Sequence, residues 1–585
     1  LVACIASKTF KSYPMKLFPI LSILSLYFFY LNTVACPPDS ENETFTDPPQ
    51  QNIGDTSPIQ NSNTDSKPKA KDPKQGNSPG THVLVIGGGY SASGNQLSLE
   101  SNVKYFRKIR QKIHLQDAQE ETYFADGNDS ARDLQYFDPS YTVPLINQVL
   151  AEIFGNPNTV SHQYRTNTLI PNGSASIQSI DQWLTQRKKS LTSDNNLIYF
   201  TGHGGKGATK TPHNTTAYLW SNARLKVSDF VKKLDQLPAK QSTFLIMVQC
   251  YSGGFANVIF EDGDPGKRFT DRSRAGFFST IQSRVAAGCT PDIREENYRE
   301  YSTSFWEALS GVTRMGKKIE KPDYDDDGKT SLMEAHSYVC IHSETIDIPL
   351  KTSDVLLRKY MGPKTKTTPK KKEDKNILEK LLTKLDNYES NSTPVEKNLE
   401  DFTKTDYLAW ASSEEKAIFN ALSLLLELHS NFPGKDNKAL QEELKKEKDR
   451  LVKEKKISLD QKNKYRDELR KRLKKKYPEL VNPYHGRVSE IIHSKEKDVI
   501  LSIINNQSTW DKLLKAKRKS NQLESDKFQI EKKEAKVLRL RRCMENIFLT
   551  HKLKEKGTVE QKDNFQKLQA LERCDPQKQW AMKKN

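Results

Sequence analysis

Cysteine is scarce in this chain, and the scarcity excludes one class of protein. Seven cysteines in 585 residues are too few for a disulfide framework. A long apolar run is also lacking, because the stretch near the N-terminus has only about fifteen mostly apolar residues, fewer than the ~20 that a membrane-spanning helix needs. The length instead predicts a protein built from two or more units.

Acidic residues are in short supply only in the C-terminal part of the chain. Residues 1–360 contain 39 Lys and Arg against 38 Asp and Glu, whereas the remaining residues contain 53 against 36. The first part therefore has the composition of a near-neutral globular protein. The basic character belongs to a separate tail.

The first methionine is Met15, and the sequence "MKLFPILSILSLYFFYLNTVAC" follows from it. A charged start, an apolar stretch and small residues before a cysteine are typical of a secretory signal peptide. Residues 1–14 are expected to lie upstream of its start. Ala35 before Cys36 resembles a bacterial lipobox, although Thr33 stands where Leu is usual. We expect an exported protein that is lipidated on Cys36; ordinary secretion and an uncleaved anchor are the alternatives.

Composition divides the rest of the chain. Residues 37–80 are rich in Pro, Asn, Ser, Asp and Gln without an apolar period, as in a flexible tether. A second change, to Lys, Thr, Pro and Asp, marks a linker, and beyond it Lys, Glu and Leu follow helical periods. The predicted units are a signal peptide with lipobox (15–36), a tether (37–80), an α/β domain (81–358), a linker (361–396) and a basic, partly coiled-coil-like helical domain (397–585).

Strand and helix patterns alternate over the first domain. The apolar runs "THVLVIG", "NLIYF" (196–200), "TFLIMVQC" (243–250) and the shorter "SRVAAGC" (283–289) predict strands. Helical spacing is found in "LSLESNVKYFRKIRQKI", "VSDFVKKLDQL" and "STSFWEALSGV". This alternation predicts a mainly parallel sheet with helices on both faces.

Two of these strands end on residues that carry chemistry. His203 follows one apolar strand in "LIYFTGHGG", and Cys250 follows the next in "FLIMVQCYSGG". The carboxyl ends of neighbouring parallel strands collect functional groups, and an imidazole can activate a thiol as a nucleophile. The backbone N–H groups of Gly204 and Cys250 could bind an oxyanion. Cys289, which also ends an apolar run, is the competing thiol, and an inert buried cysteine is the plain alternative.

The His-Gly and Gln-Cys strand ends resemble the caspase-like fold of cysteine peptidases. "CYSGG" is similar to the legumain branch, and the chain is identified as a member of a bacterial caspase-like group of legumain type, over roughly residues 81–345. Gln249 directly before Cys250 departs from the caspase pattern. The resemblance implies cleavage after Asp or Asn, a pocket on the segment "RVAAGCTPD" to which Arg284 and Asp292 are assigned as substrate-binding candidates, and no organic cofactor.

The sequence "DYDDDGKTSLME" satisfies the calcium-loop pattern D-x-[DN]-x-[DN]-G-x5-E. In that pattern alternate side chains converge on one cation, glycine permits the turn and a distant glutamate closes the shell. A solvated acidic turn is the alternative. The expected Ca²⁺ ligands are Asp323, Asp325, Asp327, Lys329 through its backbone carbonyl, and Glu334.

Together these features predict an exported cysteine endopeptidase with a Cys-His dyad. Two alternatives remain: a catalytically silent caspase-like surface scaffold whose tail binds a partner, and a transamidase that uses the same dyad. The tail contains no recognisable nucleic-acid motif, and its lysines alternate with glutamates, as on a solvated helical face. For an exported protein, anionic lipid or cell-wall polymers are the expected partners rather than DNA. Cys543 and Cys574 could pair in an oxidising compartment.

Overall fold

The computed structural model describes residues 80–189, 194–362, 399–505 and 508–580. The predicted signal peptide with Cys36, the tether up to residue 79 and the linker from residue 363 lie outside these ranges. Among the helices of the described ranges, none combines the length and the hydropathy needed to cross a membrane.

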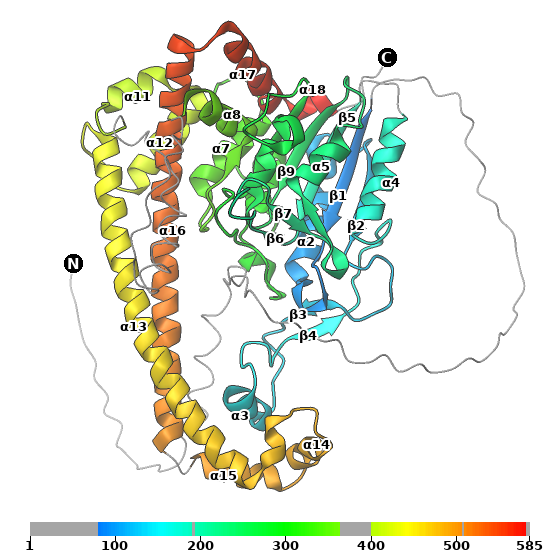
Figure 1. Cartoon of the computed structure of the whole chain (residues 1–585), viewed down its shortest axis with the longest axis vertical. Helices are drawn as coiled ribbons and strands as arrows, with labels where there is room; N and C mark the ends of the chain where they lie inside the picture. The colour runs from blue at the N-terminus through cyan, green and yellow to red at the C-terminus, as the bar shows by residue number, and fades with distance from the viewer. Residues whose placement is uncertain (1–79, 190–193, 363–398, 506–507, 581–585) are drawn as a thin grey trace, which may run out of the picture.

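A six-stranded sheet forms the centre of the first part of the chain (Figure 1). The strand order is β2–β1–β5–β9–β10–β11, and every neighbouring pair is parallel except β10 with β11. The central strands are buried on both faces, which explains why their sequences are continuous apolar runs. The strands are β1 (Thr81–Gly87), β2 (Gln119–Phe124), β5 (Asn195–Thr201), β9 (Ser242–Met247), β10 (Arg274–Phe278) and β11 (Leu350–Lys351).

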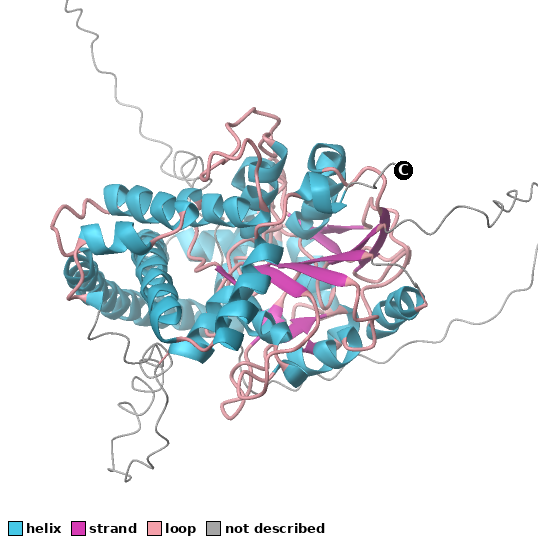
Figure 2. Ribbon diagram, turned by 90° about the horizontal axis from the view of Figure 1, so that it is seen from above, coloured by secondary structure: helices cyan, strands magenta, loops and turns pink. Residues whose placement is uncertain are grey.

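Helices cover both faces of this sheet (Figures 1 and 2). One face packs against α2 (Leu97–Ile109), α6 (Tyr301–Ser310) and α7 (Leu332–His342). There the rings of Phe106, Tyr199 and Trp306 lie 5.0–5.4 Å apart between centroids. The opposite face is covered by α4 (Ile177–Lys188) and α5 (Val227–Leu234), and α8 (Thr352–Met361) follows β11. The predicted α/β class with a mainly parallel sheet is confirmed.

Individual elements were predicted unevenly. The strands expected from the first apolar runs are present as β1, β5 and β9, and the three expected helices are α2, α5 and α6. The strand predicted at 283–289 is wrong. Two N–H groups of this segment bond to side chains and not to a neighbouring strand. Ala286 N–H donates to the sulfur of Cys250, Ala287 N–H donates to Asp347, and Gly288 has φ +125°. The strand next to β9 is instead β10, which the sequence analysis missed.

Smaller elements surround the carboxyl ends of the strands. Two antiparallel sheets are formed, β3 with β4 and β6–β7–β8, and α3 lies between β3 and β4 along the chain. The apolar face of α3 packs on the distant end of the helical region, and Arg470 Nε donates to the carbonyl oxygen of Ile153 at 3.1 Å. The bounds are β3 (Leu134–Tyr136), β4 (Gln163–Arg165), β6 (Gly204–Gly205), β7 (Thr216–Tyr218), β8 (Arg224–Lys226) and α3 (Leu145–Phe154).

The C-terminal region is helical, as predicted (Figure 1). Its two long helices lie side by side as an antiparallel hairpin, and α16, with 49 residues, is roughly 70 Å long. Pro433 occupies the first turn of α13, where its missing N–H costs no hydrogen bond. The helices are α11 (Lys404–Trp410), α12 (Ser413–Leu425), α13 (Pro433–Lys476), α14 (Gly486–His493), α15 (Glu496–Asn505), α16 (Ser508–Lys556), α17 (Val559–Glu572) and α18 (Pro576–Trp580).

The helical region shares a hydrophobic core with the sheet. Phe565, Leu568 and Trp580 belong to the same buried cluster as the central strands. The hydroxyl of Thr81, at the start of β1, donates to the carbonyl oxygen of Trp580 at 3.2 Å. The region that the composition separated as a tail is therefore packed into the α/β unit.

Candidate functional site

His203 and Cys250 leave the sheet side by side. β5 and β9 are parallel neighbours in the register Phe200↔Met247, and Val248 N–H extends the ladder to the carbonyl oxygen of Phe200 at 3.1 Å. The two chains stay close beyond the strands, because a Cβ added to Gly204 would lie 2.2 Å from the carbonyl oxygen of Cys250. Only glycine fits there, so the structure brings these three predicted residues to one place.

The loop after β1 orients the imidazole of His203. Its Nε2 lies 2.7 Å from the carbonyl oxygen of Gly94 and 2.9 Å from Oε1 of Gln96. A carbonyl oxygen can only accept, so Nε2 carries the proton and donates, and the lone pair of the neutral ring is on Nδ1. The edge of the Tyr90 ring packs against the imidazole with centroids 5.3 Å apart. Nδ1 is thus the nitrogen equipped to act as a base.

Asn95 fixes the shape of the same loop. Gly89 N–H donates to its side-chain oxygen at 3.1 Å, and its side-chain nitrogen donates to Asp133 at 3.2 Å. Gly94, Asn95 and Gln96 were not among the site residues predicted from the sequence. The signal available for them was the loop "GGGYSASGNQ" at the carboxyl end of a predicted strand, where functional residues are expected.

The thiol of Cys250 is covered by the segment Arg284–Ala287, hereafter the cap segment. Cys250 is only 2% exposed. Its sulfur accepts the N–H of Ala286 at 3.3 Å and as a thiol can donate to the carbonyl oxygen of the same residue at 3.8 Å. Tyr251 N–H donates to the carbonyl oxygen of Arg284 at 2.8 Å. The cap segment therefore contacts the sulfur directly and restricts access to it.

Polar side chains surround this centre. Gln249 is 1% exposed, and within the described residues neither atom of its amide has a hydrogen-bond partner. Its aliphatic part lies against Gly204. On the exposed side, the ammonium group of Lys206 lies 5.7 Å from the centre of the Tyr251 ring. These groups offer an amide and a positive charge close to Cys250.

The two predicted substrate-binding residues have different surroundings. Arg284 belongs to the cap segment, and its guanidinium forms an ion pair with Glu534 of α16 at 3.6 Å. Asp292 is fully buried and accepts hydrogen bonds from Arg294 at 2.7 Å and from Asn297 at 2.8 Å. Burial opposes ionisation of Asp292, but the bonds from Arg294 prevail and lower its pKa. Its carboxylate is committed to this loop, and no described contact joins it to Cys250.

A second cysteine and histidine lie in direct contact on α7. Cys340 Sγ is 3.6 Å from Nε2 of His336, whose Nδ1 is 2.8 Å from the hydroxyl of Tyr301. Burial lowers the pKa of His336 to about 3 and raises that of Cys340 to about 12. Both groups are therefore neutral near pH 7, and the thiol lacks nucleophilic character. Cys289 is partly buried against the main core.

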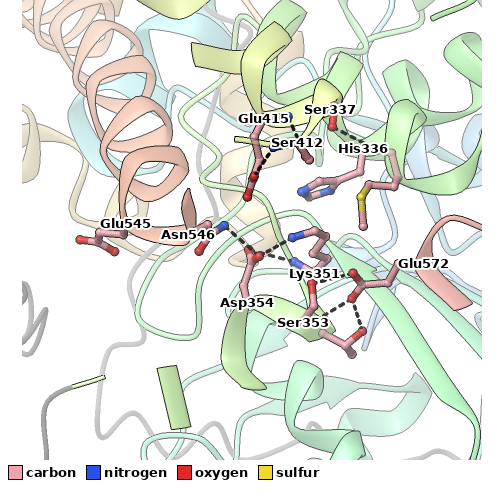
Figure 3. A network of polar contacts seen from close by, with 12 residues as sticks. His336, Ser337, Lys351, Ser353, Asp354, Ser412, Glu415, Glu545, Asn546 and Glu572 are labelled. Carbon is pink, nitrogen blue, oxygen red and sulfur yellow. Dashed lines mark hydrogen bonds and ion pairs between the residues drawn. The ribbon is translucent and has the colours of Figure 1, made fainter. Parts of the chain in front are cut away.

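A polar network next to this pair joins the sheet domain to the helical region (Figure 3). Lys351 and Asp354 form a buried ion pair at 2.6 Å, and Asn546 of α16 donates to Asp354 at 2.9 Å. Glu572 of α17 accepts from the backbone and hydroxyl groups at the start of α8, including both groups of Ser353 at 2.6 Å. Cys340 and Cys543 line an adjoining cavity of about 40 Å³. Cys543 and Cys574 are free thiols.

The acidic loop fits a cation in part. One carboxylate oxygen from each of Asp323, Asp325 and Asp327 lies within 4.8 Å of the others, on an exposed surface. Glu334 is buried in a capping box at the start of α7, where its oxygens accept from Tyr324 N–H and from Ser331 N–H at 2.8 Å. Lys329 N–H donates to Asp327 at 2.9 Å. The three aspartates could hold Ca²⁺ as they stand, whereas Glu334 would have to exchange its hydrogen bonds.

Comparison of the chain with family models and with curated proteins returned no match.

Proposed function

We propose that this protein is a cysteine endopeptidase of the caspase and legumain type, with Cys250 as nucleophile and His203 as general acid and base. The observation that carries the proposal is the arrangement at the ends of β5 and β9. There a thiol that accepts a backbone N–H and an imidazole whose Nε2 proton is held by Gly94 and Gln96 follow neighbouring parallel strands. A mainly parallel sheet with helices on both faces, which the resemblance implies, agrees with the proposal.

The proposed reaction uses the two strand ends in sequence. The thiol of Cys250 gives its proton to His203 and the sulfur attacks the carbonyl carbon of the peptide bond. The C–N bond breaks as His203 passes that proton to the leaving amine. Water, deprotonated by His203, then hydrolyses the thioester, and the proton returns to the sulfur. The backbone N–H groups of Gly204 and Cys250 bind the developing oxyanion. Among the described residues close to Cys250, the exposed ammonium group of Lys206 could bind an Asp side chain before the cleaved bond, and the amide of Gln249 could bind an Asn side chain once it is uncovered.

Three further proposals accompany the peptidase. The aspartates of the loop at residues 323–327 bind Ca²⁺ and order the start of α7. The protein is exported and held at a bacterial envelope through Cys36. The basic helical region, with its excess of Lys and Arg, faces an anionic lipid or cell-wall surface.

The direct test is cleavage of a peptide library varied at the residue before the scissile bond. The full chain is required, because α17 and α18 complete the core. Wild type, Cys250→Ala and His203→Ala are compared in the presence of Ca²⁺. Cleavage after Asp or Asn that both variants abolish supports the proposal. Absence of cleavage in wild type, even after the site has been opened as described below, would favour a silent scaffold.

The transamidase alternative uses the same residues and differs only in the second step. Adding an amine nucleophile to the cleavage reaction separates the two. Capture of the acyl group by the amine in place of water would assign the protein to that class.

A further inference from the structure

The cap segment is attached to the helical region at both of its ends. At the first end, Arg284 pairs with Glu534 of α16, and Lys448 of α13 binds the same carboxylate at 2.8 and 3.0 Å. The side chain of Glu534 is 7% exposed, so water screens this three-residue contact only weakly. The segment that covers Cys250 is thus tied to the α13–α16 hairpin.

At the other end the link passes through a buried loop. Ala287 N–H donates to the carboxylate of Asp347 at 2.7 Å. Arg539 of α16 in turn donates to the backbone carbonyl oxygen of Asp347 at 2.8 Å and to those of Ser343 at 2.6 Å and Thr345 at 2.9 Å. Arg539 lies five residues after Glu534 on the same helix. One helix therefore fixes both ends of the cap segment.

Closure of the cap segment conflicts with nucleophilic attack by Cys250. An attacking thiolate needs a carbonyl carbon within about 3–3.5 Å of the sulfur. In the structure that approach is limited by Val285 and Ala286, which pack on Cys250 and Tyr251, and by the N–H of Ala286 on the sulfur itself. Attack requires the segment to move. The contacts of α16 oppose this movement, together with the hydrogen bond from Tyr251 N–H to the carbonyl oxygen of Arg284.

We propose that α16 is a regulatory helix that keeps the cap segment closed over Cys250 through Glu534 and Arg539, and that loosening these contacts opens the site. Arg284 is then part of the closing device rather than of the substrate pocket. The biological role of such a helix rests on the proposed peptidase function. Its control of access to the Cys250 thiol can be measured without any substrate.

The test is the rate at which iodoacetamide alkylates Cys250 in the full chain, followed by mass spectrometry of the modified peptide. Glu534→Gln removes the charge that holds Arg284 and Lys448, and we expect alkylation to become roughly 5- to 30-fold faster, the range that corresponds to 1–2 kcal/mol. Arg284→Gln removes the other partner of this ion pair and should accelerate alkylation by a similar factor. In the Arg284→Gln background, Glu534→Gln should add little to the alkylation rate, because both changes break the same ion pair between Arg284 and Glu534.

The matched control is Glu524→Gln. Glu524 also lies on α16 and also pairs with a lysine of α13, Lys455, but it has no described contact with the cap segment. This variant should alkylate like wild type. Protection of the buried thiols Cys340 and Cys543 in every variant reports that the fold is intact.

The outcomes separate the two proposals. Faster alkylation of Cys250 together with faster peptide cleavage supports both, and faster alkylation with no cleavage in any variant supports the regulatory helix while rejecting the peptidase. Unchanged or slower alkylation in both Glu534→Gln and Arg284→Gln, with Cys340 protected, overturns the inference whatever the cleavage result. Equal acceleration by Glu524→Gln would also overturn it, since the effect would then reflect general loosening of the hairpin.

Discussion

The described part of the molecule contains two cysteine–histidine pairs, both of them buried, and the groups that contact them differ. Cys340 and His336 touch on one helix at the junction of two layers, where burial keeps both groups neutral. Cys250 and His203 come from two strands, and backbone groups hold each of them: an N–H on the sulfur and a carbonyl oxygen on the imidazole. Contact between a cysteine and a histidine is therefore a poor guide to their chemistry. The polar groups that can stabilise a thiolate or an imidazolium are a better guide.

The largest expected effect is on peptide cleavage. Cys250→Ala should lower kcat/KM by at least about 10³-fold, because the nucleophile is lost. Cys340→Ala and His336→Gln should leave kcat/KM close to the wild-type value if they fold. Steady-state kinetics on the best peptide from the library measures both. A strong loss in Cys340→Ala with an unchanged unfolding free energy would contradict the ranking of the two pairs.

The second effect concerns stability and pH. His336 keeps a pKa of about 3 in the fold, whereas the unfolded chain takes up a proton near pH 6.5. As the pH falls through 6.5, His336 binds a proton in the unfolded state but not in the folded state. The unfolding free energy therefore decreases. Between pH 7.5 and 4.5 wild type should lose about 2.5 kcal/mol of unfolding free energy relative to His336→Gln.

Urea unfolding of both proteins across this pH range checks the prediction, because the other titrating groups cancel in the difference. A difference that does not vary with pH would mean that the pKa of His336 is the same in the fold as in the unfolded chain.

A smaller effect is expected from Gln96, which positions His203. Gln96→Ala removes one acceptor of the Nε2 proton and should lower the rate of Cys250 alkylation about five- to tenfold, the equivalent of roughly 1 kcal/mol for one hydrogen bond. Gln96→Glu keeps an acceptor and adds a negative charge, which stabilises the imidazolium and should move the pH profile of alkylation to higher pH. Identical profiles for the two variants would show that Gln96 acts on the packing of the loop alone.

The smallest effect is that of calcium on α7, the helix that carries the second pair. With the weak affinity of exposed loops, in the range of about 10⁻⁴–10⁻³ M, 1 mM Ca²⁺ should add about 0.4–1.4 kcal/mol to the unfolding free energy. Thermal unfolding with Ca²⁺ and with EDTA measures this gain. Asp325→Asn should remove most of the gain in unfolding free energy. Asp326 lies in the same loop but outside the ligand positions, so Asp326→Asn should keep the gain.

Much of the site could be predicted because it depends on local patterns. Apolar runs that stop at His203 and at Cys250 give both the strands and the strand ends, and parallel neighbours bring such ends together. The glycine at 204 agrees with a close approach of two backbones. The three aspartates gather because their spacing in the turn is itself local.

Other features were not predictable from short patterns. The segment 283–289 has the composition of a strand, but its N–H groups bond to Cys250 and to Asp347, which lies some 60 residues further along the chain. Arg284 suited a substrate pocket by sequence, yet its partner is Glu534, 250 residues away. The carboxylate of Asp292 forms an ion pair with Arg294, two residues later. The sequence alone does not distinguish such a paired carboxylate from one that lines a pocket.

The sequence by itself determined the mainly parallel sheet, the helical character of the C-terminal region, the candidate thiol and imidazole, and the acidic loop. These follow from periodicity and spacing over a few residues. Only the tertiary structure decided which nitrogen of His203 carries the proton, that the cap segment covers Cys250, and that the basic helices complete the core of the α/β unit. Those features depend on hydrogen bonds and packing between residues far apart in the chain, and their energies arise only once the layers have assembled.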